Sequence, residues 1–215
     1  MGVVVLVLGE SGSGKSASLR NFEPDDVGVF NVAGKPLPFR KKLPVVASSN
    51  YNEIMSAIAK GSRKSYVIDD SQYLMCFEAF AKAKEAGYGK YTDMALHFYN
   101  LVKYVIDKTP PDIIVYFLHH VEQDSNTGKI KAKTLGKMLD NQLTVEGLFS
   151  IVLMCGTDGR EHYFITQSDG TNTAKSPMEM FDLKIPNDLK FVDTKIREYY
   201  EIGDNKNDLS AERLG

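Results

Sequence analysis

One stretch of eight residues, Gly9 to Ser16 (GESGSGKS), constrains the fold of this chain more than any other feature. It follows the apolar run Val3 to Leu8 and matches the pattern G-x-x-x-x-G-K-[ST] of a phosphate-binding loop. Such a loop joins a strand to a helix, because backbone N–H groups at the positive end of the helix hold the phosphate. The sequence therefore predicts a strand at Val3 to Leu8 and a helix at Ser16 to Asn21.

The residue types inside this loop suit a triphosphate with a magnesium ion. Side chains would block the close approach of a phosphate, and the glycines keep the backbone bare. Lys15 can reach the β- and γ-phosphates as a compact positive charge, and the Ser16 hydroxyl can ligate Mg²⁺. We expect ATP and Mg²⁺ as cofactors, with the nucleotide bound by Gly9, Glu10, Ser11, Gly12, Ser13, Gly14, Lys15, Ser16 and Ala17.

A second segment, Ser65 to Asp70 (SYVIDD), is an apolar run that ends in two acids. This is the form of a Walker B strand, whose carboxylate completes the metal shell opposite the loop serine. We expect Asp69 to hold Mg²⁺ together with Ser16, and Asp70 to position or deprotonate the attacking water. Asp70 can also serve as the N-cap of a helix that begins near Ser71.

Two histidines follow another apolar run, 112–118 (DIIVYFL), which predicts a buried strand. Polar groups at the carboxyl edge of a strand beside the phosphate loop are placed to sense a γ-phosphate. His119 or His120 is therefore a sensor candidate, and His120 a catalytic one. An ordinary hydrogen-bonded loop histidine is the alternative interpretation.

The remaining periodicities predict one α/β domain over residues 1–202, with a flexible C-terminal tail over 203–215. We expect a three-layer α/β/α P-loop fold, with a mostly parallel sheet and a C-terminal β-hairpin. Val27 to Val32 is expected to pair beside the first strand. The other expected elements are helices at 52–60, 72–86, 91–108 and after Asp188, and hairpin strands at 148–155 and 161–166.

Composition narrows the class of protein. The 215 residues are 43% hydrophobic, and 26 basic residues nearly balance 28 acidic ones, so any contact with nucleic acid needs a local patch. Cys76 and Cys155 lie in apolar segments without metal-ligand spacing, which indicates free thiols in a reducing compartment. The apolar N-terminal run is too short for a signal peptide or a membrane span. We expect a cytoplasmic protein with no membrane association.

Lysines gather in two segments. Residues 34–42 (GKPLPFRKK) form a proline-containing basic loop, and residues 129–137 carry Lys129, Lys131, Lys133 and Lys137 without an acid. The alternation of the first three puts their charges on one side of an extended segment, as in a hairpin laid against the body. We expect the second segment to contact single-stranded DNA, with a solvated, lysine-guarded hairpin edge as the alternative.

These motifs together resemble the bacteriophage ATP-binding proteins of the P-loop class with a RecA-like AAA ATPase core, including phage single-strand-annealing ATPases. The resemblance covers nearly the whole chain. It rests on GESGSGKS at 9–16, GKPLPF at 34–39, VIDD at 67–70, FLHH at 117–120, KTLGKMLD at 133–140 and TQSDGTNTAKSP at 166–177.

The resemblance implies a Mg²⁺-dependent ATPase in the host cell cytoplasm, which couples ATP binding to single-stranded DNA binding or annealing in phage recombination. It also implies a homo-oligomer and a phage single-strand-binding protein as partner. RecA-like cores carry a catalytic glutamate after the second strand, where this chain has Asn31 to Gly34. Asp70 or Glu122 must therefore replace it, or hydrolysis is slow. Lys175, in a polar loop, is a candidate finger onto a neighbouring protomer's γ-phosphate, with a solvated surface lysine as the alternative.

Two other functions fit parts of the pattern. The first is a nucleotide-gated binding module with negligible hydrolysis, whose partner is another phage protein. The second is a small-molecule kinase, which would need arginines in a lid over the phosphates. The arginines of this chain are not clustered, which argues against the kinase.

Overall fold

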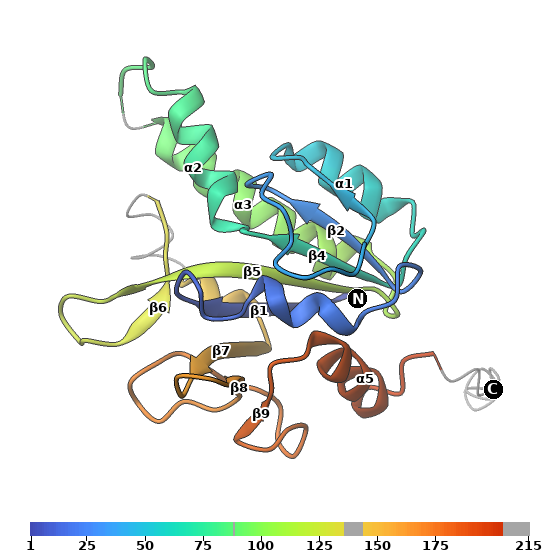
Figure 1. Ribbon diagram of the computed structural model, residues 1–215. Coiled ribbons are helices and arrows are strands. Elements are labelled where there is room, and N and C mark those ends of the chain that lie inside the picture. The colour runs from blue at the N-terminus through green and yellow to red at the C-terminus, as the bar shows by residue number, and fades with distance from the viewer. Residues whose placement is uncertain (88, 136–143, 204–215) are drawn as a thin grey trace, which may run out of the picture.

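The structure is a computed structural model that describes residues 1–87, 89–135 and 144–203. A mixed sheet runs through this part of the chain (Figure 1). Its strands are β1 (Val3–Gly9), β2 (Val27–Asn31), β3 (Val45–Val46), β4 (Ser65–Asp69), β5 (Ile114–Gln123), β6 (Ile130–Ala132), β7 (Ile151–Thr157), β8 (His162–Ile165) and β9 (Lys184–Pro186). The helices are α1 (Tyr51–Ala59), α2 (Gln72–Ala81), α3 (Gly89–Lys108) and α5 (Leu189–Tyr199), with 3-10 helices η1 (Ser16–Asn21) and η2 (Val145–Leu148).

The strand order is β3-β2-β4-β5-β1-β7-β8-β9, and β6 pairs with β5 outside this path. In this order, the strands β3, β2, β4, β5, β1 and β7 are parallel to one another. The pairs β7–β8 and β8–β9 are antiparallel. The central strands are apolar on both faces, which is the composition of a parallel sheet covered on both sides. The mostly parallel sheet and its C-terminal β7–β8 hairpin agree with the prediction.

The neighbours of β1 differ from the prediction. We expected β2 beside β1, but β4 and β5 lie between them, and β1 pairs with β5 and β7. The register of β1 with β5 extends from Val3 opposite Ile114 to Gly9 opposite His120, over the whole of β1. The five-residue β2 could cover less of this fully apolar strand, so the longer β5 takes the central place.

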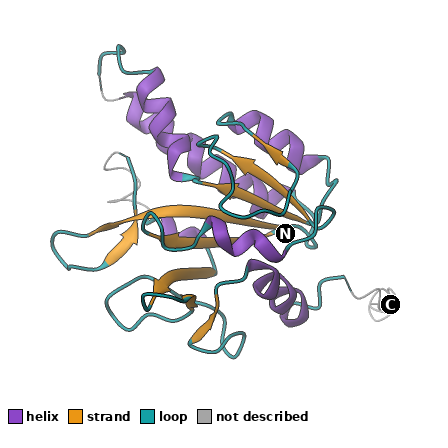
Figure 2. Ribbon diagram, in the orientation of Figure 1, coloured by secondary structure: helices purple, strands orange, loops and turns teal. Residues whose placement is uncertain are grey.

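Helices cover both faces of the sheet (Figure 2). On one face α1, α2 and α3 pack against the strands through a core that includes Ile58, Leu74 and Phe98. On the other face η1 and α5 pack through a second core that includes Phe22 and Val192. The protein is therefore a mixed α/β structure compatible with three layers.

Several helices and strands have bounds or types that differ from the prediction. The helix expected at Ser16–Asn21 has these bounds but is of the 3-10 type. The strand expected at 112–118 continues to Gln123, because β6 pairs with its far end, and it therefore includes both histidines. The helix expected at 72–86 ends at Ala81. The strands β3 and β9 were not predicted.

The C-terminal helix follows its prediction closely. The Asp188 carboxylate accepts hydrogen bonds from the backbone N–H groups of Lys190 and Phe191, as an N-cap does. Of the expected tail 203–215, residues 204–215 lie outside the described residues. Within the described ranges, no helix combines the length and hydropathy that a membrane crossing requires.

Candidate functional site: the Gly9–Ser16 loop and its cavity

The loop between β1 and η1 has the backbone of an anion nest. Gly12 and Gly14 have left-handed φ angles of 79° and 94°, and Lys15 is right-handed with φ of −49°. Left- and right-handed residues in alternation turn successive N–H groups toward one concavity. A Cβ on Gly14 would lie 2.9 Å from Cγ of His162, so the β8 side chain closes over this glycine. Both conformation and packing therefore require glycine here.

Lys15 is the buried cation of the loop. Its Nζ donates to the carbonyl oxygens of Gly9 and Glu10, both at 2.8 Å, and only 5% of the residue is exposed. Burial lowers the pKa of Lys15, while the nearby carboxylates Asp69 and Asp70 act in the opposite direction. The lysine is thus held at the floor of the loop by the loop's own backbone.

The metal-binding pair that the sequence predicted is in contact. The Ser16 hydroxyl donates to Oδ1 of Asp69 at 2.8 Å, at the carboxyl end of β4. Asp69 is 4% exposed, and burial raises its pKa although the hydrogen bond from Ser16 lowers it. Magnesium takes one or two protein oxygens and completes its shell with phosphate oxygens and water. One hydroxyl and one carboxylate side by side fit that requirement.

Asp70 has an unusual conformation and two charged neighbours. Its φ of 59° is left-handed, which few residues other than glycine adopt. Its carboxylate accepts from Nζ of Lys35 and from Nε2 of His120, both at 3.1 Å. Burial raises the pKa of Asp70, but these two hydrogen bonds outweigh it and the net direction is downward. The side chain does not cap α2, since it is engaged with Lys35 and His120.

The two histidines have different environments. His120 lies at the cavity and touches the ring of Tyr73 edge-on, with the centroids 5.6 Å apart. His119 is fully buried behind it, with Nδ1 2.9 Å from Oγ of Ser71 and Nε2 2.8 Å from the carbonyl oxygen of Lys133. Burial lowers the pKa of His119 to about 4, so it is neutral at pH 7. Of the two sensor candidates, His120 is therefore the one beside the phosphate loop.

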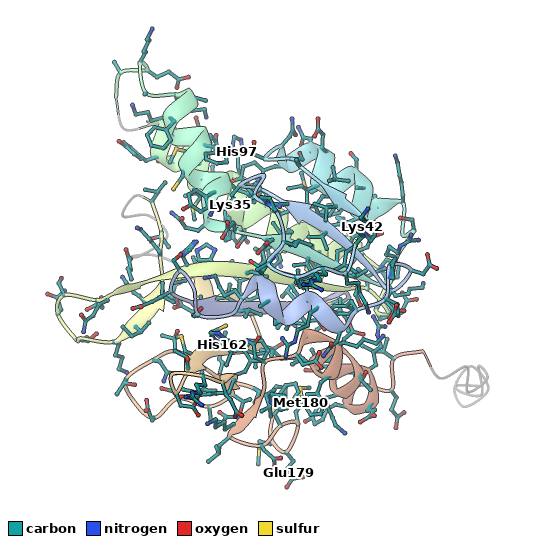
Figure 3. All side chains as sticks on the ribbon, viewed as in Figure 1. Lys35, Lys42, His97, His162, Glu179 and Met180 are labelled. Carbon is teal, nitrogen blue, oxygen red and sulfur yellow. The ribbon has the colours of Figure 1, made fainter. Side chains whose placement is uncertain are left out.

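A cavity of about 370 Å³ brings most of these groups together. Its lining contains the predicted residues Ser11, Gly12, Gly14, Lys15, Ser16, Ala17, Asp69, Asp70 and His120, and also Lys35, Pro36, Pro38 and His162. The predicted residues Gly9 and Glu10 contribute carbonyl groups to Lys15, and Ser13 is buried. In Figure 3, Lys35 and His162 are labelled on opposite sides of β1.

Sequence reasoning missed Lys35 and His162 as parts of the site. Lys35 belonged to a quoted motif, GKPLPF, so a signal existed, but its charge was interpreted only as part of a basic loop face. His162 carried no such signal. Its position depends on the pairing of β8 with β7, which brings the start of β8 to the phosphate loop.

Two other predicted catalytic residues do not line this cavity. The Glu122 carboxylate lies 3.7 Å from Nζ of Lys131 on the β5–β6 hairpin. Lys175 is half-buried, and its backbone N–H and C=O bond to Val152 of β7 at 2.9 and 2.8 Å. The polar loop is thus fastened to the sheet at this lysine. A role for Lys175 in a neighbouring protomer stays a prediction.

The predicted lysine segment does form a hairpin. β6 pairs antiparallel with the end of β5, and the side chains of Lys129 and Lys133 are exposed. Nζ of Lys131 lies 3.5 Å from Oδ2 of Asp124, so acids of β5 and its turn offset part of this charge. Lys137 lies outside the described residues. DNA contact by this hairpin stays a prediction.

A second hollow of about 720 Å³ adjoins the first one, since Ala17 and His162 line both. Its other walls come from η1, β8 and β9, and include Arg20, Tyr163 and Asn187. Asn187 is 2% exposed, and its Nδ2 has no hydrogen-bond partner among the described residues. The second hollow therefore continues from the cavity beside the loop, through the two residues that line both.

Comparison with protein-family models finds no match to this chain, and a search of curated proteins finds no significant relative.

Proposed function

We propose that this protein binds a magnesium nucleoside triphosphate, in particular ATP, and hydrolyses it slowly, as a P-loop ATPase of RecA-like architecture. The observation that carries this proposal is one cavity lined by a glycine nest, a buried lysine and a hydroxyl–carboxylate pair. Each of these groups has a partner in a metal-bound triphosphate. The nest can bind the phosphate oxygens, and Lys15 can offset their negative charge. Ser16 and Asp69 can ligate the metal.

The other residues of the cavity supply the chemistry around the terminal phosphate. Bound Mg²⁺ would neutralise the charge that develops on the phosphate oxygens. Asp70 is ionised at pH 7 because hydrogen bonds hold its pKa low, so it can accept a hydrogen bond from an attacking water. A carboxylate of low pKa is a weak general base, since proton transfer to it is poorly favoured. Slow turnover, or a binding module with negligible hydrolysis, follows from this chemistry.

The adjoining hollow favours a nucleotide over a free polyphosphate. It opens from Ala17, the residue after the loop serine, and its lining includes Tyr163, whose aromatic ring is a surface on which a base can stack. We therefore expect ATP to bind more tightly than inorganic triphosphate. Among the described residues, the lining of the phosphate-loop cavity contains no arginine, whereas a kinase lid would place arginines over the phosphates.

The test of this function is Mg²⁺-dependent ATP binding and hydrolysis by the wild type and by Lys15→Ala. A charge-assisted hydrogen bond contributes about 1.5–3 kcal/mol, so the variant should lose at least about tenfold in ATP affinity. Lys84→Ala, which removes an exposed lysine outside both cavities, is the matched control. Equal ATP affinity in the wild type and in Lys15→Ala would overturn the assignment.

We further propose that nucleotide binding is coupled to single-stranded DNA binding in a homo-oligomer, in the context of phage recombination. Two hydrogen bonds support this coupling: His119 Nε2 donates to the Lys133 carbonyl at 2.8 Å, and Lys133 N–H donates to the His120 carbonyl at 2.9 Å. The hairpin base is thus bonded to the strand that carries His120 to the cavity. A shift at that histidine could bias the position of the hairpin.

Single-stranded DNA binding should then depend on ATP and on salt. The log-log salt slope of affinity should be about −0.7 for each phosphate neutralised. The double variant Lys129→Ala/Lys133→Ala should reduce the magnitude of this slope, with Lys84→Ala as control. ATP-dependent DNA binding with an unchanged slope in the double variant would remove the hairpin from the interface.

A further inference from the structure

Lys35 is held over the phosphate cavity by the loop that follows β2. Asn31, the last residue of β2, hydrogen-bonds through its side chain to the Lys35 carbonyl, and Gly34 turns the chain with a left-handed φ of 69°. Val32 N–H donates to the Asp69 carbonyl at 3.1 Å, which ties the start of this loop to the Walker B strand. The backbone of the loop is therefore fixed at the point from which Lys35 departs.

The side chain of Lys35 is held mainly at its tip. Nζ lies 3.1 Å from Oδ2 of Asp70 and 5.2 Å from the ring centroid of Tyr73, while the side chain is 63% exposed. The Asp70 side chain is only 12% exposed. The carboxylate is thus fixed in the protein, whereas the lysine can change partner by rotating a solvated stem. An ion pair with an exposed partner is weak, so a stronger anion can replace the carboxylate.

The cavity contains the place for such an anion. Lys15 and Lys35 line the same space, and Lys15 is bonded to carbonyl oxygens of the loop floor. A γ-phosphate on the nest would enter this space with up to two negative charges. It would attract the exposed cation more strongly than the single charge of Asp70 does, because Coulomb attraction scales with charge at equal distance.

We propose that Lys35 binds the γ-phosphate of the nucleotide held by its own chain, and that this exchange releases Asp70 to orient the attacking water. Lys35 is then a catalytic residue that acts in cis, and the inference rests on the proposed function. Without a γ-phosphate, the ion pair occupies Asp70. When a γ-phosphate is bound, Asp70 keeps His120 as its hydrogen-bond donor and accepts a second hydrogen bond from the attacking water.

The hydrolytic step balances with groups already in place. The water oxygen forms a bond to the γ-phosphorus, and the bond from that phosphorus to the β–γ bridging oxygen breaks with its electron pair passing to ADP. The water proton passes to Asp70 and from there to solvent or phosphate. Lys35 neutralises charge on the γ-phosphate oxygens while the bond to ADP breaks, as a cationic finger does.

The segment after β2 brings a cation to the cavity in place of the expected acid. That segment has no acid at Asn31 to Gly34, where RecA-like cores carry a glutamate, and it instead brings a cation to the cavity at the next position. The charge that the sequence led us to expect from Lys175 of a neighbouring protomer is therefore available within one chain. Lys175 does not line this cavity.

The experiment compares Lys35→Gln with Lys42→Gln, which removes an exposed lysine of the same loop that does not line the cavity (Figure 3). Affinities for Mg·ADP and for a non-hydrolysable Mg·ATP analogue are measured by calorimetry, and the hydrolysis rate in single turnover. In Lys35→Gln we expect ADP affinity within about twofold of wild type, a roughly tenfold loss of preference for the triphosphate, and at least a tenfold slower single turnover. Lys35→Arg should restore part of the triphosphate preference, and Lys42→Gln should behave as wild type.

The outcomes separate this inference from the function on which it rests. A wild type that binds neither nucleotide would overturn the proposed function. A wild type that binds both, with a Lys35→Gln variant that keeps the triphosphate preference and the rate, would overturn only the role of Lys35. Mixing Lys35→Gln with Lys15→Ala tests the cis arrangement, because recovery of hydrolysis in the mixture would show that Lys35 acts on a neighbouring protomer.

Discussion

Acid should destabilise this protein through one buried histidine, His119. The folded environment lowers its pKa from 6.5 to about 4, chiefly by burial, while the hydrogen bond with the Lys133 carbonyl opposes the shift. The charges of His120 and Lys15 act in the same direction as burial. A difference of about 2.5 pKa units at 1.36 kcal/mol per unit corresponds to about 3 kcal/mol.

The direction of this pH dependence is set by the proton that the chain takes up when it unfolds. Between pH 6.5 and 4 the unfolded chain carries a proton on His119 and the folded protein does not, so unfolding takes up a proton in this range. The stabilisation is fully present above pH 6.5 and is lost as the pH falls toward 4. Below pH 4 both states are protonated at this residue, and the contribution does not decrease further.

The assay is urea unfolding of the wild type and of His119→Gln at several pH values between 7.5 and 4. Glutamine keeps a side-chain donor for the Lys133 carbonyl but does not titrate. The wild-type free energy of unfolding minus that of the variant should fall by about 3 kcal/mol across this range. Other titrating groups, Asp69 and Asp70 included, cancel in this difference. Parallel pH profiles for the two proteins would refute the reasoning.

Three further predictions concern single contacts. Gly14→Ala should lower ATP affinity at least about tenfold in calorimetry, because its Cβ would lie 2.9 Å from Cγ of His162 at a φ of 94°; unchanged affinity would contradict the nest geometry. Asp69→Asn should weaken the dependence of ATP binding on Mg²⁺ while leaving metal-free binding unchanged, which a Mg²⁺ titration checks. Arg197→Met should cost about 3 kcal/mol in urea unfolding, because it leaves the Asp193 carboxylate, 3% exposed and 2.7 Å from Nε of Arg197, without its cation. A loss below about 1 kcal/mol would show that Ser65 and Tyr116, which also donate to Asp193, compensate for it.

The sequence by itself determined the local parts of the candidate site. The bare glycine loop with Gly12 and Gly14, the proximity of Ser16 to Asp69 and the helix that begins after Asp188 were all predicted. Each of these features depends on a few neighbouring residues, whose types indicate a loop without side chains, the end of a strand or the cap of a helix. The same holds for the parallel character of the sheet, because apolar strands alternate with amphipathic helices along the chain.

Only the tertiary structure decided which strands are neighbours and which side chains meet across the cavity. The sequence predicted β2 as the partner of β1, and the structure places β5 there instead, since burying apolar area has no directional preference and the choice depends on the packing of the whole sheet. From that choice follow the burial of His119, the exposure of His120 to the cavity, and the contact of Lys35 with Asp70. These contacts join residues 35 and more positions apart in the chain, and their geometry is set by strand register rather than by local residue pattern.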